Sequence, residues 1–199
     1  MKTLIKLIML SLTAITLCLT LTGCGSKEEN STSDSLKDSK ELIVKSVVND
    51  VEIKEIDGEN VTASLVGFEG ELLTRKGDSL EIKLPEPKAG INLSPAEVLY
   101  IGIPKNSSLS IKVESEISAI KLDKLSVNHI EAVSDAGNIT IIAPTGTLDA
   151  KTEAGKIHSS LSPKMDIQKQ GDGEVTQGTI DNASSTVVLR SSTGDIELK

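Results

Sequence analysis

The sequence predicts an all-β fold, built as a single-stranded, parallel-type β-solenoid that follows a short secretory segment and a flexible tether. Three observations predict this class. Apolar and polar residues alternate over many short runs, which is the periodicity of strands with one buried face. No long stretch has helical spacing, and a glycine-containing cassette recurs in the second half of the chain at spacings of 18, 18 and 21 residues.

The chain begins with the features of an export signal. Lys2 and Lys6 precede an uncharged stretch over residues 7–22, which is shorter than the roughly 20 residues that a bilayer-spanning helix needs. The stretch ends in Leu21-Thr22-Gly23-Cys24, which matches the lipobox of bacterial lipoprotein signals. The sequence therefore predicts a signal peptide over residues 1–23 and a diacylglyceryl group on the thiol of Cys24. An uncleaved signal-anchor with an incidental cysteine is the alternative.

The segment after the lipobox is polar. Residues 24–40 contain one leucine among serine, threonine, asparagine, glycine and charged residues, so they bury little apolar surface and are predicted to form a disordered tether. Lipid anchoring is stable with two or more acyl chains, such as a diacylglyceryl group and a further acyl chain such as palmitate. The expected location is the extracytoplasmic face of the cell membrane, with the bilayer as a partner through Cys24.

Composition narrows the classes of partner. The predicted domain, residues 41–199, has the size of one domain. Loss of the two lysines of the signal leaves 19 basic and 29 acidic residues, and this net negative charge repels nucleic-acid backbones. Phe68 and Tyr100 are the only aromatic residues, which argues against platforms that stack bases or sugars on several rings. Cys18 would leave with the signal, so no disulfide is expected.

Strands are expected in order along the domain wherever apolar residues occupy every second position. Turn residues such as Asp57-Gly58, Lys76-Gly77-Asp78 and Ala136-Gly137-Asn138 separate the runs. The runs are Val51/Ile53, Val61/Ala63/Leu65, Leu80/Ile82/Leu84, Leu99/Ile101/Ile103, Leu109/Ile111/Val113, Ile139/Ile141, Val187/Leu189 and Ile196/Leu198. Residues 41–113 repeat less clearly and are expected to form a cap or an irregular beginning of the stack.

The cassette consists of a polar residue, two intervening residues, glycine, a polar residue and Ile or Val. It occurs at Ser134–Ile139, Thr152–Ile157, Gln170–Val175 and Ser191–Ile196. Each copy is predicted to join two short strands at a corner with glycine at positive φ, and each unit is too small to close a core alone. Stacked units that each pair with the units before and after them would form a solenoid. A sandwich of antiparallel hairpins is the competing architecture.

These residues resemble a known family. The chain resembles the bacterial putative-adhesin domain family in three features: the terminal Ser192-Thr193-Gly194-Asp195-Ile196, the similar segments at residues 136–139 and 154–157, and the strand over residues 99–104. The resemblance covers residues 45–199. It implies a repetitive β fold with Gly-Asp-Ile corners and a surface location, and it brings no catalytic residues. Two corners depart from the pattern, with Asn138 and Lys156 in place of the aspartate.

No catalytic, metal or cofactor site is predicted. His129 and His158 are the only histidines, and alternation directs both toward solvent. The corner acids, such as Asp172 with Glu174 and Asp195 with Glu197, fit neither a helix-loop-helix calcium loop nor a calcium-binding nonapeptide repeat. Solvated turn acids account for them.

The sequence therefore predicts a non-catalytic cell-surface lipoprotein that presents a repetitive β domain for adhesion or protein binding, with a protein or another component of the cell envelope as the partner. An accessory protein in envelope-stress sensing or signalling, contacting a membrane partner, is the alternative. A polysaccharide lyase on a solenoid would need a groove of clustered acids, bases and aromatic residues.

Overall fold

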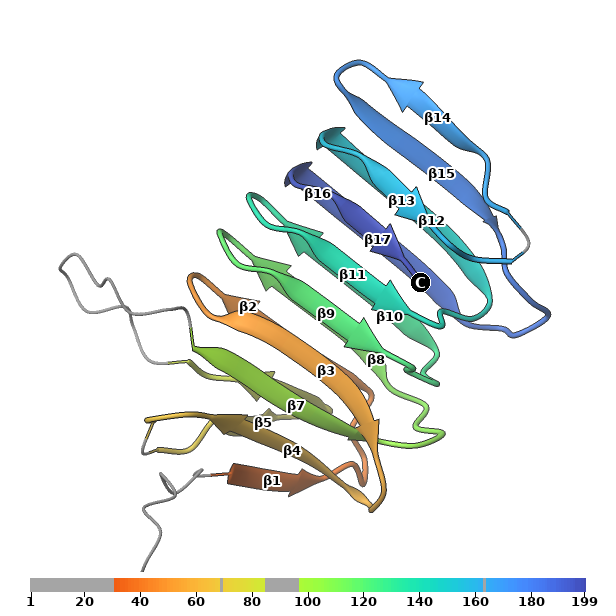
Figure 1. Cartoon of the computed structure of the whole chain (residues 1–199). Coiled ribbons are helices and arrows are strands. Elements are labelled where there is room, and N and C mark those ends of the chain that lie inside the picture. The colour runs from red at the N-terminus through yellow and green to blue at the C-terminus, as the bar shows by residue number, and fades with distance from the viewer. Residues whose placement is uncertain (1–30, 69, 85–96, 163) are drawn as a thin grey trace, which may run out of the picture.

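The computed structural model describes residues 31–68, 70–84, 97–162 and 164–199, and these form two mixed β-sheets packed face to face (Figure 1). Every described element is a strand, so the expectation of an all-β fold is confirmed. Sheet A has eight strands in the spatial order β1-β4-β7-β3-β9-β11-β17-β13, and sheet B has nine in the order β14-β15-β12-β16-β10-β8-β2-β6-β5.

The strand bounds follow the chain from Ser31 to Leu198. They are β1 Ser31–Ser35, β2 Glu41–Ser46, β3 Asp50–Ile56, β4 Asn60–Leu65, β5 Leu73–Lys76, β6 Ser79–Ile82, β7 Val98–Pro104, β8 Ser110–Ser115, β9 Ile120–Asp123, β10 His129–Ser134, β11 Ile139–Ile142, β12 Thr147–Ala154, β13 Ile157–Ser159, β14 Ile167–Gln170, β15 Gly173–Thr179, β16 Thr186–Thr193 and β17 Ile196–Leu198.

Five two-strand units make up the body of the molecule. In each unit one strand lies in sheet B, a short corner follows, and the next strand lies in sheet A. The units are β2/β3, β8/β9, β10/β11, β16/β17 and β12/β13, and neighbouring units pair in parallel at equivalent positions. We call these the corner units.

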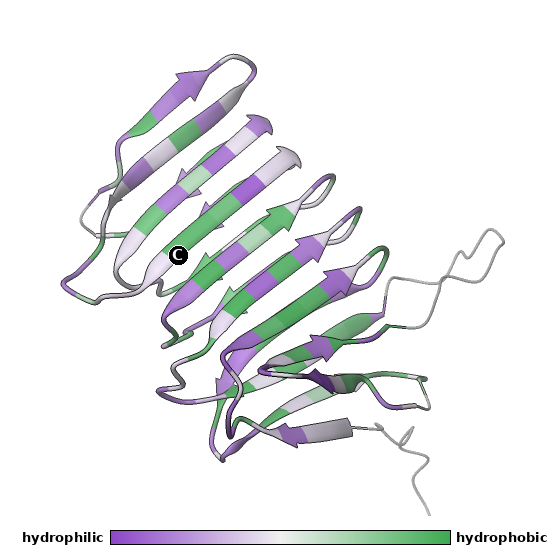
Figure 2. Ribbon diagram, turned by 180° about the vertical axis from the view of Figure 1, so that it is seen from behind, coloured by the Kyte–Doolittle hydropathy of each residue, from purple (hydrophilic) through white to green (hydrophobic). Residues whose placement is uncertain are grey.

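The core lies between the sheets and is aliphatic. Buried and accessible residues alternate along the strands, which places every second residue in the core. Hydrophobic and hydrophilic colours alternate along many of the same strands (Figure 2). Ile53, Ile111, Leu122, Leu189 and Leu198 are among the fully buried members of one continuous cluster. The apolar members of the predicted runs are buried wherever they fall within a strand.

The order of the units in space differs from their order in sequence. β16/β17, the last unit of the chain, lies between β10/β11 and β12/β13, and β2/β3, the first unit, lies between β8/β9 and the pair β6 and β7. The prediction that each unit pairs with the units before and after it in sequence is therefore wrong. Backbone pairing requires only a matching strand edge, so a later unit can close a gap left by earlier ones.

Two local predictions are also wrong. Gln170–Val175 is not a corner between the sheets, because β14 and β15 form an antiparallel hairpin within sheet B, with Gly171 at φ +65° in its turn. Residues 41–113, expected to form a cap or an irregular beginning, are not irregular throughout, because they contain the complete corner unit β2/β3 and most of β8.

A strand lies within the segment predicted to be a tether. β1 pairs antiparallel with β4 at the edge of sheet A, and an edge strand is held by backbone hydrogen bonds without needing apolar side chains. Arg75 on β5 reinforces this edge: its guanidinium donates to the Oδ1 of Asp34 at 3.0 Å and to the Oγ of Ser39 at 2.6 Å, and also to the carbonyl of Ser35.

Candidate functional site

The corner cassette has a structural role that begins with a buried hydroxyl. Ser46 Oγ donates to the carbonyl of Asn49 at 2.5 Å and accepts from the Asn49 N–H at 3.1 Å, and Ser115 makes the same pair of bonds with Ser118. Thr152 Oγ1 instead donates to the carbonyl of Gly194 in the neighbouring unit at 2.9 Å. At these three corners the hydroxyl therefore satisfies backbone groups, and Ser191 Oγ donates to the carbonyl of Gly137 at 3.4 Å. Ser134 Oγ is the exception among the described corners, since it is buried without a partner.

The glycine of the cassette is needed for close stacking of the corners. A Cβ at Gly137 would overlap the carbonyl oxygen of Ser118 in the unit on one side, and a Cβ at Gly194 would overlap that of Gly137. The expected positive φ occurs at Gly194, at +157°, whereas Gly137 and Gly155 are not among the residues with positive φ. The predicted reason for these two glycines is therefore wrong, because space and not backbone conformation selects them.

The residue after the glycine links adjacent units. Asn138 Oδ1 accepts from the N–H of Asp195 at 2.9 Å, and Asp195 Oδ1 accepts from the N–H of Lys156 at 2.8 Å. Asp50 plays the same part toward the N–H of Ala119, at 2.9 Å. We call these bonds the corner ladder. Asn and Asp both supply the required oxygen, and Lys156 lies in the last corner unit, where no further unit donates.

The two histidines lie in different sheets. His158 is exposed on β13, and its Nε2 lies 3.8 Å from Asp195 Oδ2, while His129 lies half-buried at the start of β10 in sheet B. The described residues contain no group of three or more His, Cys, Asp or Glu side chains placed to hold a metal ion. Asp195 thus stands in a hydrogen-bonded ladder with a histidine beside it.

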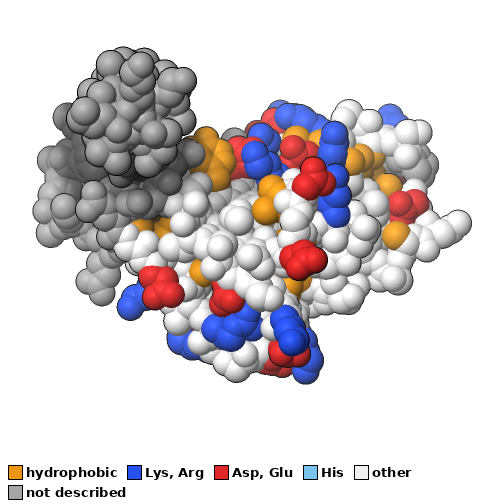
Figure 3. Space-filling view, turned by 90° about the horizontal axis from the view of Figure 1, so that it is seen from below, with side chains coloured by type: hydrophobic (Ala, Val, Ile, Leu, Met, Phe, Trp, Pro, Cys, Tyr) orange, Lys and Arg blue, Asp and Glu red, His pale blue; other side chains and the backbone are white. Residues whose placement is uncertain are grey.

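The outer face of sheet B carries alternating charges. Glu114 Oε2 lies 2.8 Å from Lys45 Nζ and its Oε1 lies 3.2 Å from Lys112 Nζ, and these hydrogen bonds hold the pKa of Glu114 below its ordinary value. Arg190 forms two bonds to the Asp149 carboxylate, at 2.6 and 3.0 Å, which lower the pKa of Asp149. Seen from the end of the molecule that bears β1, basic and acidic side chains are interspersed (Figure 3).

The outer face of sheet A carries a continuous line of side chains at right angles to the strands. Register places one residue of each strand in this line, which we call the sheet A row: Ser31, Ser64, Tyr100, Glu52, Lys121, Thr140, Glu197 and His158. None of them is buried. With strands about 4.8 Å apart, the row extends over about 34 Å.

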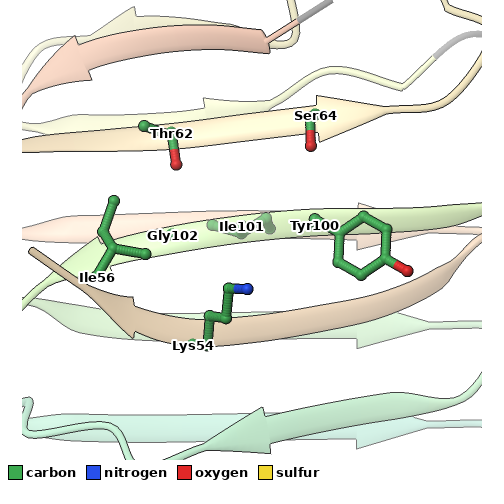
Figure 4. Close-up of a pocket in the computed structure, with 7 residues that line it drawn as sticks. All are labelled: Lys54, Ile56, Thr62, Ser64, Tyr100, Ile101 and Gly102. Carbon is green, nitrogen blue, oxygen red and sulfur yellow. The ribbon is translucent and has the colours of Figure 1, made fainter. Parts of the chain in front are cut away.

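A shallow hollow of about 280 Å³ lies beside the row on sheet A. Figure 4 shows its lining from β3, β4 and β7, with the hydroxyls of Thr62 and Ser64 directed toward β7 from one side and the amine of Lys54 from the other. Tyr100 and Gly102 lie on β7 between them, and Ile56 and Ile101 complete the lining. None of these residues was predicted from the sequence to form a site, although Gly102 inside an apolar strand run was a visible signal.

Cys24 and the predicted signal peptide, residues 1–23, lie outside the described residues, so lipidation stays a prediction. Among the described residues, no helix is long and apolar enough to cross a membrane.

Comparison with known proteins gives a likeness of fold. A crystal structure of a putative cell adhesion protein from Clostridium sporogenes superposes with a TM-score of 0.57 and 13% sequence identity, covering 86% of this chain and 99% of that one. No family model matches the sequence. No curated protein matches it either. The solved structure supports an adhesin-like β fold, as the resemblance of the corner motif had indicated.

Proposed function

We propose that the chain is a non-catalytic lipoprotein of the cell envelope, held on the extracytoplasmic face of the membrane by a lipid on Cys24, whose β domain binds a protein or polymer in adhesion. The sheet A row carries this proposal. It presents eight side chains at regular spacing on one face, and such a face suits an extended partner. The putative cell adhesion protein that shares the fold supports the same role.

We further infer that the five corner units form a short β-solenoid. Equivalent positions of neighbouring units pair in parallel and in register, and the corner ladder repeats from unit to unit. This stacking is what gives the row its constant spacing, because each unit adds one residue to it.

The anchor is tested by labelling cells that express the full chain with an alkyne-bearing fatty acid. We expect label in the membrane fraction for the natural chain and none for Cys24→Ser, which should leave the membrane. Label of equal strength in both chains would contradict the anchor.

The binding face is tested by crosslinking in the native cell and recovery of the bound material. The variant Lys121→Glu/Glu197→Lys exchanges two charges in the sheet A row, and Lys112→Glu/Glu131→Lys does the same on sheet B with the same net charge. We expect the first pair to reduce recovery and the second to preserve it. Recovery of a protein of the same membrane would favour the envelope-sensing alternative. Equal recovery from all three chains would contradict the role of the row.

A further inference from the structure

The hollow on sheet A has the composition of a small binding site. Tyr100 is the one exposed aromatic side chain among the described residues, with 37% of its surface accessible. It lies on the solvent-exposed face of β7. An exposed ring on a sheet whose other outward residues are mostly polar offers a flat apolar surface next to hydrogen-bonding groups. That combination suits a ligand with one apolar face and a polar rim.

Gly102 shapes the floor of the hollow. A Cβ at this position would lie 2.5 Å from Thr62 Oγ1 and 2.7 Å from Ile56 Cδ1, so any larger residue would displace the walls. Glycine inside a strand weakens it and often marks a place where a ligand approaches the backbone closely. The ring of Tyr100 is not among the atoms nearest to that Cβ, so the tyrosine does not serve to cover the glycine.

Within the described residues, the polar side-chain groups around the hollow have no hydrogen-bond or ion-pair partner. Within the described part of the chain, no hydrogen bond or ion pair involves the Lys54 ammonium or the side-chain hydroxyls of Thr62, Ser64 and Tyr100. Lys54 faces Asp123 in the β3–β9 register, but no ion pair joins them. The nearby Glu52 is already paired with Lys121, at 3.1 Å. The ammonium of Lys54 and the hydroxyls of Thr62 and Ser64 therefore surround the ring of Tyr100 and the backbone of Gly102.

We propose that this hollow binds one carboxylated sugar unit, such as a uronic acid residue of an acidic polysaccharide. The C–H face of a pyranose ring packs on Tyr100, its hydroxyls bond with Thr62 and Ser64, and its carboxylate pairs with Lys54. The net negative charge of the protein opposes an anionic ligand only weakly, because physiological salt screens exposed charges that lie more than about 8 Å away. The proposal deepens the proposed function by naming a partner chemistry for sheet A.

The protein supplies its own reporter for this site. Tyr100 is the only tyrosine in the chain, and there is no tryptophan. Tyrosine emission therefore arises from the hollow alone, and a sugar that packs on the ring changes it directly.

The experiment titrates the full chain, purified in detergent, with trigalacturonate and with neutral galactotriose, and follows the emission of Tyr100. We expect a saturable change with trigalacturonate and weaker binding of the neutral sugar, by up to about fivefold, which is the most that one exposed ion pair allows. Lys54→Gln should abolish this preference. Lys151→Gln, which removes an equal charge from the outer face of sheet B, should leave it intact.

Three results would overturn the proposal: no saturable change in emission, the same affinity for both sugars, or an equal loss of preference in the two lysine variants. Gly102→Ala gives a second test, since a filled hollow should lose binding while the circular dichroism stays that of the natural chain. If that variant does not fold, Lys54→Gln decides alone. Binding by a purified chain does not depend on acylation of Cys24, so failure of the anchor and failure of the site are separate results.

Discussion

Asp195 is a residue whose type and position suggest ligand binding, but its carboxylate has a structural role as a hydrogen-bond acceptor for the backbone. Its Oδ1 accepts from the N–H of Lys156 in the neighbouring corner unit, at 2.8 Å. Asn138 does the same for the N–H of Asp195, so the carbonyl-type oxygen matters and the charge does not. The Gly-Asp-Ile pattern is thus a stacking device, and its departures at Asn138 and Lys156 follow the position of each unit in the ladder.

Replacing Asp195 with alanine should therefore destabilise the fold. The variant leaves the Lys156 N–H without its acceptor, and the loss of one such bond costs about 1 kcal/mol. Lys156→Ala is the matched control, because Lys156 occupies the same corner position and accepts no bond from another unit; its effect should stay within about 0.5 kcal/mol. Urea unfolding would measure both midpoints. Equal shifts would contradict the ladder.

The pair of Asp149 and Arg190 predicts a dependence of stability on pH. Hydrogen bonds from Arg190 lower the pKa of Asp149 in the folded protein, so the ionised carboxylate stabilises the fold at pH values above the ordinary carboxyl pKa of about 3.9. This contribution is lost as the pH falls through the lowered pKa. Both side chains are about one-third exposed, so the effect should be no more than about 1 kcal/mol.

The measurement compares the natural chain with Asp149→Asn from pH 7 to pH 2. The difference in the free energy of unfolding should be constant down to about pH 4 and should shrink below it, as the natural chain loses its ion pair. A difference that grows toward acid pH would contradict the assigned direction.

At the scale of elements, the corners depend on the distance between neighbouring units. Gly137→Ala would place a Cβ against the carbonyl oxygen of Ser118, and backbone cannot move aside cheaply, so we expect a loss of about 2–3 kcal/mol. Gly178→Ala is the control, because its Cβ would meet the flexible end of Met165 at 2.9 Å. Thermal unfolding of both variants tests this. Similar melting temperatures would show that the corners have room.

The same geometry explains which elements were predictable. Strands such as β4, β7 and β16 follow from local alternation, and burial of one face needs nothing more. The corners of β2/β3 and β8/β9 were missed because Asn49 and Ser118 stand where glycine stands elsewhere, although Ser46 and Ser115 keep the hydroxyl. The Gln170–Val175 segment matches the cassette in sequence but belongs to a hairpin, because β14 and β15 pair with each other.

The hollow could not be predicted from spacing. Lys54, Thr62 and Tyr100 come from three strands, and β7 lies between β3 and β4 only because the order of strands in sheet A departs from the order in sequence. No local pattern encodes that order, since parallel and antiparallel edges accept any strand of suitable register.

At the scale of the whole molecule, the position of β1 would set the orientation of the domain on a membrane under the proposed anchoring. If Cys24 carries a lipid, six residues separate the anchor from Ser31, and the seven steps from Cys24 to Ser31 reach at most about 25 Å. β1 and β5 lie at one end of the stack, and the β14–β15 hairpin lies at the other (Figure 1). The hairpin is then the part farthest from the bilayer, and the sheet A row leads away from it.

The order of units makes the end of the chain a central part of the structure. Residues 186–199 form β16/β17, which fills the space between β10/β11 and β12/β13 in both sheets. Val187, Leu189, Ile196 and Leu198 are buried there. At about 1.5–3 kcal/mol for each buried side chain, they contribute about 6–12 kcal/mol, which is as large as the net stability of a typical domain.

A chain that stops at Ser185 should therefore fail to unfold cooperatively in urea, because β12, β13 and the hairpin lose the neighbour that joins them to the rest. The control lacks residues 25–35 and so loses β1, which pairs with β4 alone at an edge; it should keep a cooperative transition with a small loss of stability. If units were stacked in sequence order, removal of the last unit would only shorten the stack. A cooperative transition in the truncated chain would thus contradict the insertion of β16/β17 and favour sequential stacking.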